Sequence, residues 1–435
     1  MANKTDPKSS TESFTEPDSA SYSSFQRDIY QVLRPPLFST KPSEWEALAR
    51  SKVPPANFDY VHGSAGTSAT ADANVQAFSR YRLRPSCLVN ATRRDVGVEL
   101  FGTKYKSPLL VAPIGVQNIM HSDAEEATAR ACHNVGIPMI LSSAATRTIE
   151  QIAEVNADGD RWYQLYWPKP QCEEITASLL NRAKNSGYKV LVVTLDTFVL
   201  GWRPSDLDTA YLPFIWGQGC QIGLSDPAFN KMFEEMQKDD PRSVGEKLVE
   251  LFTIMRRPGT FKGAAKVLGN VNVLQKSKAW IDVMNSGTYR EWEDLKVLKK
   301  LWDGPITHKK AIEYGMDGII ISNHGGRQLD GAIASLDALA EIAADEKVKG
   351  SDLTLLFDSG VRTGSDVLKA LALGAKAVCI GRPYVYGLAA GGHKGVEHVL
   401  KCLLADMDNS LGNCGKKSIH DLSRDDLQIL PLSKL

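Results

Sequence analysis

The stretch Gly318-Ile319-Ile320-Ile321-Ser322-Asn323-His324-Gly325-Gly326-Arg327-Gln328 joins an apolar run to a polar loop. The apolar run is typical of a strand buried on both faces, as in a parallel sheet. The loop therefore follows the carboxyl end of a strand, where α/β proteins place their chemistry. Its histidine and arginine lie three positions apart, beside two glycines that let a ligand approach the backbone. A base beside a fixed cation suits proton abstraction from a substrate with a carboxylate; the plain alternative is an ordinary polar loop.

Outward from this loop, short apolar runs alternate with helical patterns. The runs that predict strands are 109–113, 138–141, 162–166, 190–195, 319–321, 353–357 and 377–380. The patterns that predict helices include 124–135, 173–186, 336–344 and 364–373. This alternation predicts an α/β fold with a parallel sheet, and it fits a (β/α)8 TIM barrel better than an open doubly wound sheet. The open sheet stays as an alternative, although no Gly-x-Gly-x-x-Gly follows the first strand.

Two segments interrupt the alternation. Residues 205–290 are too long for a plain connection and predict a lid or a variable insertion, with a helical pattern at 244–256. A predicted helix at 291–301 is followed almost directly by another at 309–313, with no apolar run between them. We therefore expect a TIM barrel that lacks most of strand 5 and carries a long insertion after strand 4.

Composition narrows the class of protein. With 435 residues and 43% hydrophobic side chains, the chain can bury one large core or two modest ones. Lys+Arg and Asp+Glu both number 51, so the balanced charge gives no support for a nucleic-acid partner or an anionic membrane. No apolar run is long enough to predict a membrane span. The seven cysteines are scattered and include no Cys-x-x-Cys pair, so we expect neither a disulfide framework nor a structural zinc site. This use of cysteine is typical of a protein in a reducing compartment.

The two ends of the chain carry different signals. The start is rich in Ser, Thr, Asp and Lys, so we expect residues 1–40 to be a mostly disordered tail and 41–435 to form the barrel domain. The chain ends in Ser433-Lys434-Leu435, which is typical of a peroxisomal address. This ending predicts recognition by the peroxisomal import receptor; the alternative is a chance match in a cytoplasmic protein.

Residues able to carry chemistry gather where the predicted strands end. A glycine loop after the seventh strand and a Gly-Arg pair after the eighth are typical of the phosphate site of such barrels. Each polar side chain alone could be a helix cap or a satisfied core group, but their shared position favours a site. These residues are Pro113, Ile114, Gly115, Ser142, Gln164, Tyr166, Thr194, Asp196, Arg203, Asp358, Gly360, Arg362, Gly381 and Arg382.

The 322–328 loop resembles the active-site motif of the FMN-dependent 2-hydroxy acid oxidases and dehydrogenases, which include glycolate oxidase and flavocytochrome b2. The resemblance runs from about residue 45 to about residue 422. It is reinforced by Phe58-Asp59-Tyr60, Gln164-Leu165-Tyr166, Thr194-Leu195-Asp196-Thr197 and Asp358-Ser359-Gly360-Val361-Arg362. The segment Gly201-Trp202-Arg203-Pro204 indicates lactate 2-monooxygenase as the nearest relative.

The resemblance implies a role for each matching position. It makes His324 the base, Asp196 the acid that stabilises its imidazolium, and Tyr166 a hydrogen-bonding partner of the substrate oxygen. The substrate carboxylate is bound by Arg203, Arg327 and Tyr60. The cofactor FMN is lined by Pro113, Ile114, Gly115, Ser142, Gln164, Thr194 and Ser322, and its phosphate is held by Asp358, Gly360, Arg362, Gly381 and Arg382. Gly115 stands where several oxidases carry alanine and monooxygenases carry glycine, so we expect extra room beside the flavin.

The implied function is FMN-dependent oxidation of a small, lactate-like L-2-hydroxy acid by a homo-oligomer, a tetramer in the family. The product is the 2-oxo acid or its decarboxylated derivative, and O2 is the acceptor. The family's fifth strand, of the type Pro-Ile-Leu-x-Lys-Gly, places a lysine against the flavin; here Pro305-Ile306 runs directly into Thr307-His308-Lys309-Lys310. Two alternatives stay open: a flavin oxidase that tailors a larger carboxylic acid or amine in secondary metabolism, and an impaired, non-catalytic family member.

Overall fold

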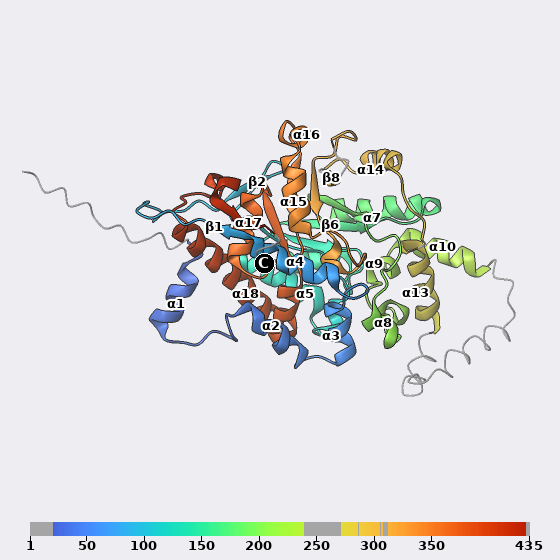
Figure 1. Ribbon diagram of the computed structural model, residues 1–435. Coiled ribbons are helices and arrows are strands. Elements are labelled where there is room, and N and C mark those ends of the chain that lie inside the picture. Colours follow the sequence, from blue (N-terminus) through green and yellow to red (C-terminus); the bar gives the residue numbers. More distant parts are fainter. Residues whose placement is uncertain (1–20, 239–270, 286, 305, 308–311, 432–435) are drawn as a thin grey trace, which may run out of the picture.

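Eight parallel strands form a closed barrel at the centre of the molecule, in the order β10-β11-β4-β5-β6-β7-β8-β9 (Figure 1). The computed structural model describes residues 21–238, 271–285, 287–304, 306–307 and 312–431. The α/β class and the parallel sheet are as predicted. The strands are β4 (Leu109–Val111), β5 (Met139–Ser142), β6 (Arg161–Tyr166), β7 (Leu191–Thr194), β8 (Ile306–Thr307), β9 (Gly318–Ile321), β10 (Thr354–Phe357) and β11 (Ala377–Ile380).

The helices between the strands cover the outside of the barrel. Two begin with a capping box that fixes their first turn: Thr148 with Gln151, and Thr363 with Asp366. The longest helix packs against α5 and α17 and is interrupted by non-helical backbone at Gly391 and its neighbour. These helices are α5 (Ala124–Val135), α6 (Ile149–Asn156), α7 (Glu173–Asn185), α14 (Leu295–Leu301), α15 (Ser335–Ala344), α16 (Glu346–Lys349), α17 (Gly364–Ala372) and α18 (Arg382–Asn413).

Within the described residues, the fifth barrel strand, β8, has two residues. It pairs with β7 through Leu191↔Ile306 and Val192↔Thr307, and with β9 through Thr307↔Gly318 alone. The sequence predicted a barrel that lacks most of strand 5, and the two described residues of β8 agree with that expectation. The helix predicted at 309–313 lies partly outside the described residues, and its described end, from residue 312, is part of a turn.

The N-terminal segment is more ordered than expected. Residues 1–20 lie outside the described part, but the prediction of a mostly disordered tail over 1–40 is wrong for α1 (Ser24–Val32). The backbone N–H of Ser23 donates to Asp408 Oδ2 at 2.8 Å, and Arg94 Nη2 donates to Ser23 Oγ at 3.2 Å. These bonds hold the start of α1 beside α18. The chain continues through α2 (Pro42–Arg50), α3 (Pro55–His62) and α4 (Ala69–Arg80).

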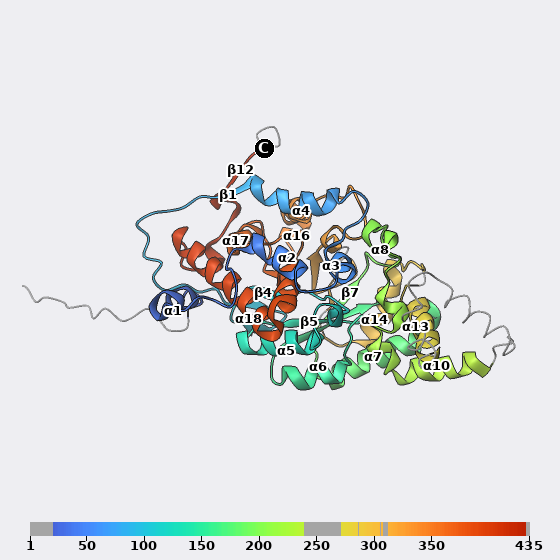
Figure 2. The ribbon, with the colours of Figure 1, turned by 90° about the horizontal axis from the view of Figure 1, so that it is seen from below.

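The described parts of the 205–290 insertion are helical and packed. Trp280 meets Phe229 edge-on with ring centroids 5.1 Å apart, and Arg182 of α7 pairs with the buried Asp226 at 3.2 Å. In both views these helices lie at the opposite end of the molecule from α1 (Figures 1 and 2). The helical pattern at 244–256 lies outside the described residues. The elements are α8 (Pro204–Asp208), η3 (Pro213–Trp216), α9 (Gln221–Leu224), α10 (Pro227–Lys238) and α13 (Val271–Met284).

Two small antiparallel sheets complete the structure. β1 (Tyr81–Leu83) pairs with β12 (Leu427–Ile429), and β2 (Val98–Leu100) with β3 (Thr103–Tyr105). Phe101 and Gly102 both have positive φ, as a two-residue type I′ hairpin turn requires. Short 3-10 helices are η1 (Gln117–Ile119), η2 (Pro170–Cys172), η5 (Trp292–Asp294), η6 (His324–Gly326), η7 (Ile419–Asp421) and η8 (Arg424–Asp426). Within the described ranges, no helix has the length and apolar character to cross a membrane.

Candidate active site

The carboxyl ends of the barrel strands open into one cavity of about 530 Å³. This volume falls in the range of roughly 300–1,000 Å³ typical of small-molecule and cofactor sites. Every site residue predicted from the sequence lines the cavity except Ser142. Those lining it are Tyr60, Pro113, Ile114, Gly115, Gln164, Tyr166, Thr194, Asp196, Arg203, Ser322, His324, Arg327, Asp358, Gly360, Arg362, Gly381 and Arg382.

The histidine loop is held in an uncommon backbone conformation. His324, Gly325 and Gly326 all have positive φ, which costs energy at a residue with a side chain. The side chain of Asn323 accepts from the Gly326 N–H at 3.1 Å, and Ser322 Oγ accepts from the His324 N–H at 3.0 Å. These local bonds let β9 end in a turn that points the imidazole into the cavity.

The loop is also fixed from outside. A Cβ added to Gly326 would lie 2.5 Å from the backbone nitrogen of Ala71 in α4, so glycine is required for this close approach. The amides of Asn74 and Asn323 exchange two hydrogen bonds, of 2.7 and 2.8 Å. Ser359 Oγ, from the loop after β10, accepts from the Gly325 N–H at 3.0 Å. The base is therefore mounted on rigid backbone.

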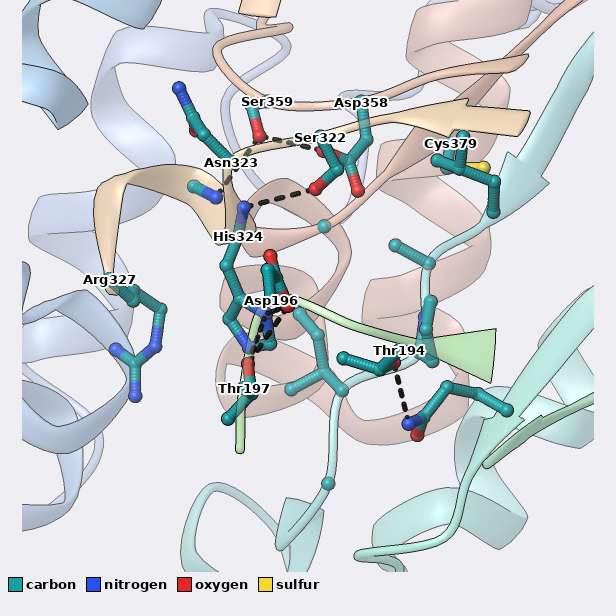
Figure 3. A pocket seen from close by; sticks show the side chains of 18 of the residues that line it. Thr194, Asp196, Thr197, Ser322, Asn323, His324, Arg327, Asp358, Ser359 and Cys379 are labelled. Atoms are coloured by element: carbon teal, nitrogen blue, oxygen red, sulfur yellow. Dashed lines mark hydrogen bonds and ion pairs between the residues drawn. The ribbon is translucent and has the colours of Figure 1, made fainter. Parts of the chain in front are cut away.

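His324 is paired through one ring nitrogen. Its Nδ1 lies 3.2 Å from Asp196 Oδ1 and 3.3 Å from Thr197 Oγ1 (Figure 3). Burial alone would raise the pKa of Asp196, but the neighbouring His324 and the hydrogen bonds from His324 and Thr197 outweigh it and lower this pKa. Because Nδ1 is engaged, Nε2 is the nitrogen placed to exchange a proton with a ligand.

Two arginines bring positive charge to the same cavity. Arg327 Nη1 donates to the carbonyl oxygens of Val61 (3.1 Å) and Gly63 (2.7 Å). Arg203 is 5% exposed, and its Nε donates to the Arg327 carbonyl at 2.9 Å. Burial, and then the nearby Arg203 and Arg382 charges, lower the pKa of Arg327 to about 9. An anionic ligand would relieve this repulsion, so the pair is suited to binding a carboxylate.

Of the two predicted tyrosines, Tyr60 is buried and Tyr166 is half-buried, and both are neutral. Burial raises the pKa of Tyr60 and of Tyr166 above the ordinary value, so both keep their phenolic proton at neutral pH. The guanidinium of Arg327 lies over the Tyr60 ring, 5.4 Å from its centroid. Each phenol can therefore donate a hydrogen bond to a ligand oxygen.

Ser142 lies behind the cavity wall. Its Oγ donates to Gln164 Oε1 at 2.9 Å, and Gln164 Nε2 in turn donates to Thr194 Oγ1 at 2.8 Å. The Ser142 hydroxyl therefore orients the Gln164 amide, and its predicted contact with the cofactor stays a prediction. Gly115 differs from expectation, because an added Cβ would lie 2.5 Å from the carbonyl oxygen of Ala144. There is close packing here, not spare room.

The predicted phosphate end combines glycine and arginine. Gly360 has a φ of 87°, and a Cβ there would lie 2.3 Å from the Asn74 carbonyl oxygen. In the described structure the Arg362 side chain makes one hydrogen bond, from Nη1 to the Val361 carbonyl at 2.9 Å, so its guanidinium keeps donors for an anion. The loop after β10 thus places the Arg362 guanidinium near the backbone of Gly360, where an anionic group could be held.

Arg382 has a different arrangement from the one the sequence suggested. Its Nη1 donates to the Gly325 carbonyl at 2.9 Å, and its Nε to the Val61 carbonyl at 3.2 Å. Its Nη2 donates to His62 and Gly63 carbonyls, each at 3.2 Å. The side chain thus joins the C-terminal end of α3 to the histidine loop and contributes its charge, while four of its five N–H groups bond to protein carbonyls. Burial lowers its pKa.

Comparison with known proteins identifies the family. The family model described as FMN-dependent dehydrogenase matches residues 49–429. The chain belongs to this family. It is similar to FMN-dependent alpha-hydroxy acid dehydrogenases of Schizosaccharomyces pombe (42% identity; 92% of this chain, 95% of the relative) and Penicillium citrinum (40% identity; 93% and 95%). A crystal structure of mandelate oxidase matches with a TM-score of 0.71 and 27% identity, covering 91% of this chain and 100% of that one.

These findings correct one expectation and support another. The similarity to two fungal alpha-hydroxy acid dehydrogenases replaces the suggested affiliation with lactate 2-monooxygenase. Family membership gives FMN as the cofactor and oxidation of an alpha-hydroxy acid as the chemistry. The cavity fits this group, because the Arg362 guanidinium, with donors not used by the protein, lines the same cavity as the amide of Gln164 and the hydroxyl of Thr194.

The family's strand-5 lysine has no counterpart in the described cavity wall. None of the described residues that line the cavity is a lysine. The two-residue β8 carries none, and Lys309 and Lys310 lie outside the described residues.

Several residues of the site were not assigned by sequence reasoning. Thr197 and Ser359 lie inside motifs that were quoted, so their position beside Asp196 and Asp358 was the available signal. Phe214 and Met284, which line the cavity from the insertion, gave no such signal because their approach depends on tertiary packing.

Proposed function

We propose that this chain is an oxidase that converts an L-2-hydroxy acid to the 2-oxo acid, with FMN as cofactor and O2 as electron acceptor. The observation that carries the proposal is the His324–Asp196 pair, which faces the same cavity as Arg203 and Arg327. A base and a carboxylate-binding pair in one cavity match the two ends of a 2-hydroxy acid. The name of the similar mandelate oxidase supports O2 as acceptor.

The side chains divide the work as follows. Arg203 and Arg327 bind the substrate carboxylate, with the Tyr60 hydroxyl as a further donor, and Tyr166 donates to the substrate oxygen. His324 Nε2 takes the proton released as the alcohol is oxidised, and Asp196 stabilises the imidazolium that results. FMN, when bound, supplies the two-electron acceptor.

The substrate's side chain is open to two candidates. The resemblance suggested a small, lactate-like acid, oxidised to the 2-oxo acid or its decarboxylated product. The cavity wall favours a larger apolar acid, because Phe214, Ile281 and Met284 of the insertion line it beside Leu200. Apolar side chains there would be buried by an apolar substituent and not by a methyl group alone.

Anaerobic mixing with a panel of acids tests the proposal. We expect the flavin band of the purified protein to bleach with L-lactate or with the larger acids L-2-hydroxy-4-methylpentanoate and (S)-mandelate. Bleaching by the larger acids alone selects the second candidate. Bound flavin that no 2-hydroxy acid bleaches contradicts the proposal, and absence of bound flavin favours an impaired, non-catalytic member.

We further propose that the chain is imported into peroxisomes through Ser433-Lys434-Leu435. The support is the sequence ending itself, and an oxidase that releases H2O2 suits that compartment. A fluorescent protein fused to the N-terminus should give punctate fluorescence that coincides with a peroxisomal marker. Removal of Leu435 should make it diffuse; a diffuse signal from the intact chain contradicts the proposal.

A further inference from the structure

All four hydrogen-bonding positions of the Gln328 side-chain amide are occupied. Its Oε1 accepts from Arg203 Nη2 at 2.7 Å and from the Gly201 N–H at 3.2 Å. Its Nε2 donates to the carbonyl oxygens of Asp196 and Val199, both at 2.9 Å. A glutamine amide offers two acceptor positions and two donors, so this one is saturated.

This arrangement allows only one orientation of the amide. Rotation by half a turn would aim the Gln328 NH2 group at two donors, on Arg203 and Gly201, and its oxygen at two carbonyl oxygens. The Gln328 amide therefore fits these four partners in one orientation only: its oxygen faces Arg203 and Gly201, and its nitrogen faces the carbonyls of Asp196 and Val199. We call this set of four bonds the Gln328 bridge.

The bridge joins the two ends of the loop that follows β7. One end carries Asp196, the partner of His324, and the other end carries Arg203. The loop lies tightly against the segment that holds Gln328: a Cβ on Gly201 would lie 2.4 Å from the Arg327 carbonyl oxygen. Gln328 thus pins both ends of this loop to the loop that carries the base.

Oxidation of a 2-hydroxy acid requires the loop that carries Asp196 and Arg203 to be held in place. In a 2-hydroxy acid the carboxylate and the reacting carbon are directly bonded, so the groups that bind them must keep a fixed separation. Apart from Gln328, the Arg203 guanidinium is held by its Nε bond to the Arg327 carbonyl at 2.9 Å and by a 3.9 Å ion-pair contact with Asp206, and neither contact reaches Asp196. The Gln328 amide supplies the missing restraint and links it to Asp196.

We propose that Gln328 is a positioning residue that sets the separation between Arg203 and the His324–Asp196 pair. The inference rests on the proposed function, because it concerns how a 2-hydroxy acid is aligned in that site. It assigns to Gln328 an effect on both substrate binding and the rate of flavin reduction.

The variant Gln328→Met tests the proposal, since it keeps the length of the side chain and removes all four bonds. In anaerobic mixing of the FMN-loaded protein with the best acid of the panel, we expect the half-saturating concentration to rise about tenfold. The reduction rate at saturation should fall by about tenfold. Gln237→Met is the matched control, because among the described residues the exposed Gln237 amide pairs with Gln275 in the insertion, away from the cavity; both parameters should stay at wild-type values.

A second variant separates the two halves of the bridge. Gln328→Glu keeps an acceptor for Arg203 but turns a carboxylate oxygen toward the Asp196 and Val199 carbonyls. We expect the half-saturating concentration to stay within about threefold of wild type while the reduction rate falls about tenfold. The pH profile of reduction should also shift for Gln328→Glu, because the anchored Asp196 loop is released.

Each outcome has a meaning. Wild-type values for both parameters in Gln328→Met overturn the inference, as does a rise in half-saturation alone, which would make Gln328 a support for Arg203 only. If Gln328→Met fails to retain FMN, an unchanged reduction rate in Gln328→Glu overturns it. A wild-type protein that binds FMN but is bleached by no 2-hydroxy acid overturns the proposed function itself, and that result is distinct from bleaching with unaltered variants.

Discussion

The barrel wall made by β9, β10 and β11 differs from the wall made by β7 and β8. Between β9 and β10 four residue pairs are in register, from Thr354↔Gly318 to Phe357↔Ile321, whereas β8 and β9 share one pair. The base, the phosphate loop and the N-terminus of α18 all follow the complete wall. The thin wall is where the family places its flavin-facing lysine. From this comparison we infer that the base and the loops proposed to hold the cofactor phosphate depend on the four-residue strands β9, β10 and β11. Asp196 and Arg203 instead follow β7, next to the short β8, so we expect β8 to affect stability and the charge beside the flavin.

Removal of the base should have the largest effect and would sharpen the comparison. His324→Ala should retain FMN, because the phosphate loops lie on other strands, and should lower the rate of flavin reduction by about 10³-fold or more. Rapid anaerobic mixing with the acid measures this rate. His133→Ala, at a surface ion pair with Asp158, is the control and should react normally. A variant at 324 that still bleaches at the wild-type rate removes His324 from the role of base.

Asp196→Asn should have the next largest effect. The amide keeps the shape of the carboxyl but cannot stabilise an imidazolium, so we expect the reduction rate to fall by about 10²-fold with FMN retained. The same mixing experiment measures it. An unchanged rate would show that the 3.2 Å contact with His324 is structural.

The Asp196 carboxyl also predicts how stability depends on pH. Its pKa is lowered in the folded protein, so its contribution to stability is present above the ordinary aspartate pKa of about 3.9 and is lost as pH falls through the folded value. Denaturant unfolding between pH 6 and pH 3 should therefore show a steeper loss for wild type than for Asp196→Asn. Equal slopes would contradict the lowered pKa.

Gly115→Ala tests the close packing beside the flavin. The added Cβ would lie 2.5 Å from the Ala144 carbonyl oxygen, so we expect a loss of stability of about 1–3 kcal/mol and weaker retention of FMN. Thermal unfolding and flavin content after gel filtration measure the two effects. Gly350→Ala is the control, because its Cβ would meet nothing closer than 3.4 Å. Unaltered stability and flavin content would restore the expectation of spare room.

The smallest expected effect is the difference in stability between two variants, and it tests the two walls directly. Leu356 of β10 and Leu191 of β7 are both fully buried, so the same substitution by alanine can be compared at each. Leu356→Ala should destabilise by about 2–5 kcal/mol, and Leu191→Ala by about 1 kcal/mol less, because the wall beside β8 can relax into the cavity that is created. Urea unfolding measures both. An equal or larger loss at Leu191 would show that the short strand does not loosen its neighbours.

The sequence predicted most of the barrel because its signals are local. Runs such as 162–166 and 377–380 are apolar and bounded by helical patterns, and they became β6 and β11. The short β8 gave no such signal, since two residues are too few for a pattern, and their pairing depends on the strands on either side. The helix at 24–32 was missed because its order comes from contacts with α18 that are remote in the chain.

The site was predicted as a set of positions, but not as a set of contacts. Strand-end position and the 322–328 motif were enough to bring together His324, Asp196 and Arg203. Two contacts depend on side-chain geometry that the spacing of residues in the sequence does not encode. Ser142 bonds to Gln164, and Arg382 donates to backbone carbonyls such as that of Gly325. The insertion's contribution through Met284 depends likewise on packing across the chain.

The absorbance spectrum of the purified full-length protein, recorded without oxygen before and after addition of a 2-hydroxy acid, tests the central claim most directly. If the site is complete despite the two-residue β8, the spectrum should show close to one FMN per chain, and the acid should bleach it. A chain that carries no flavin, or flavin that neither L-lactate nor the larger acids bleach, would contradict the account.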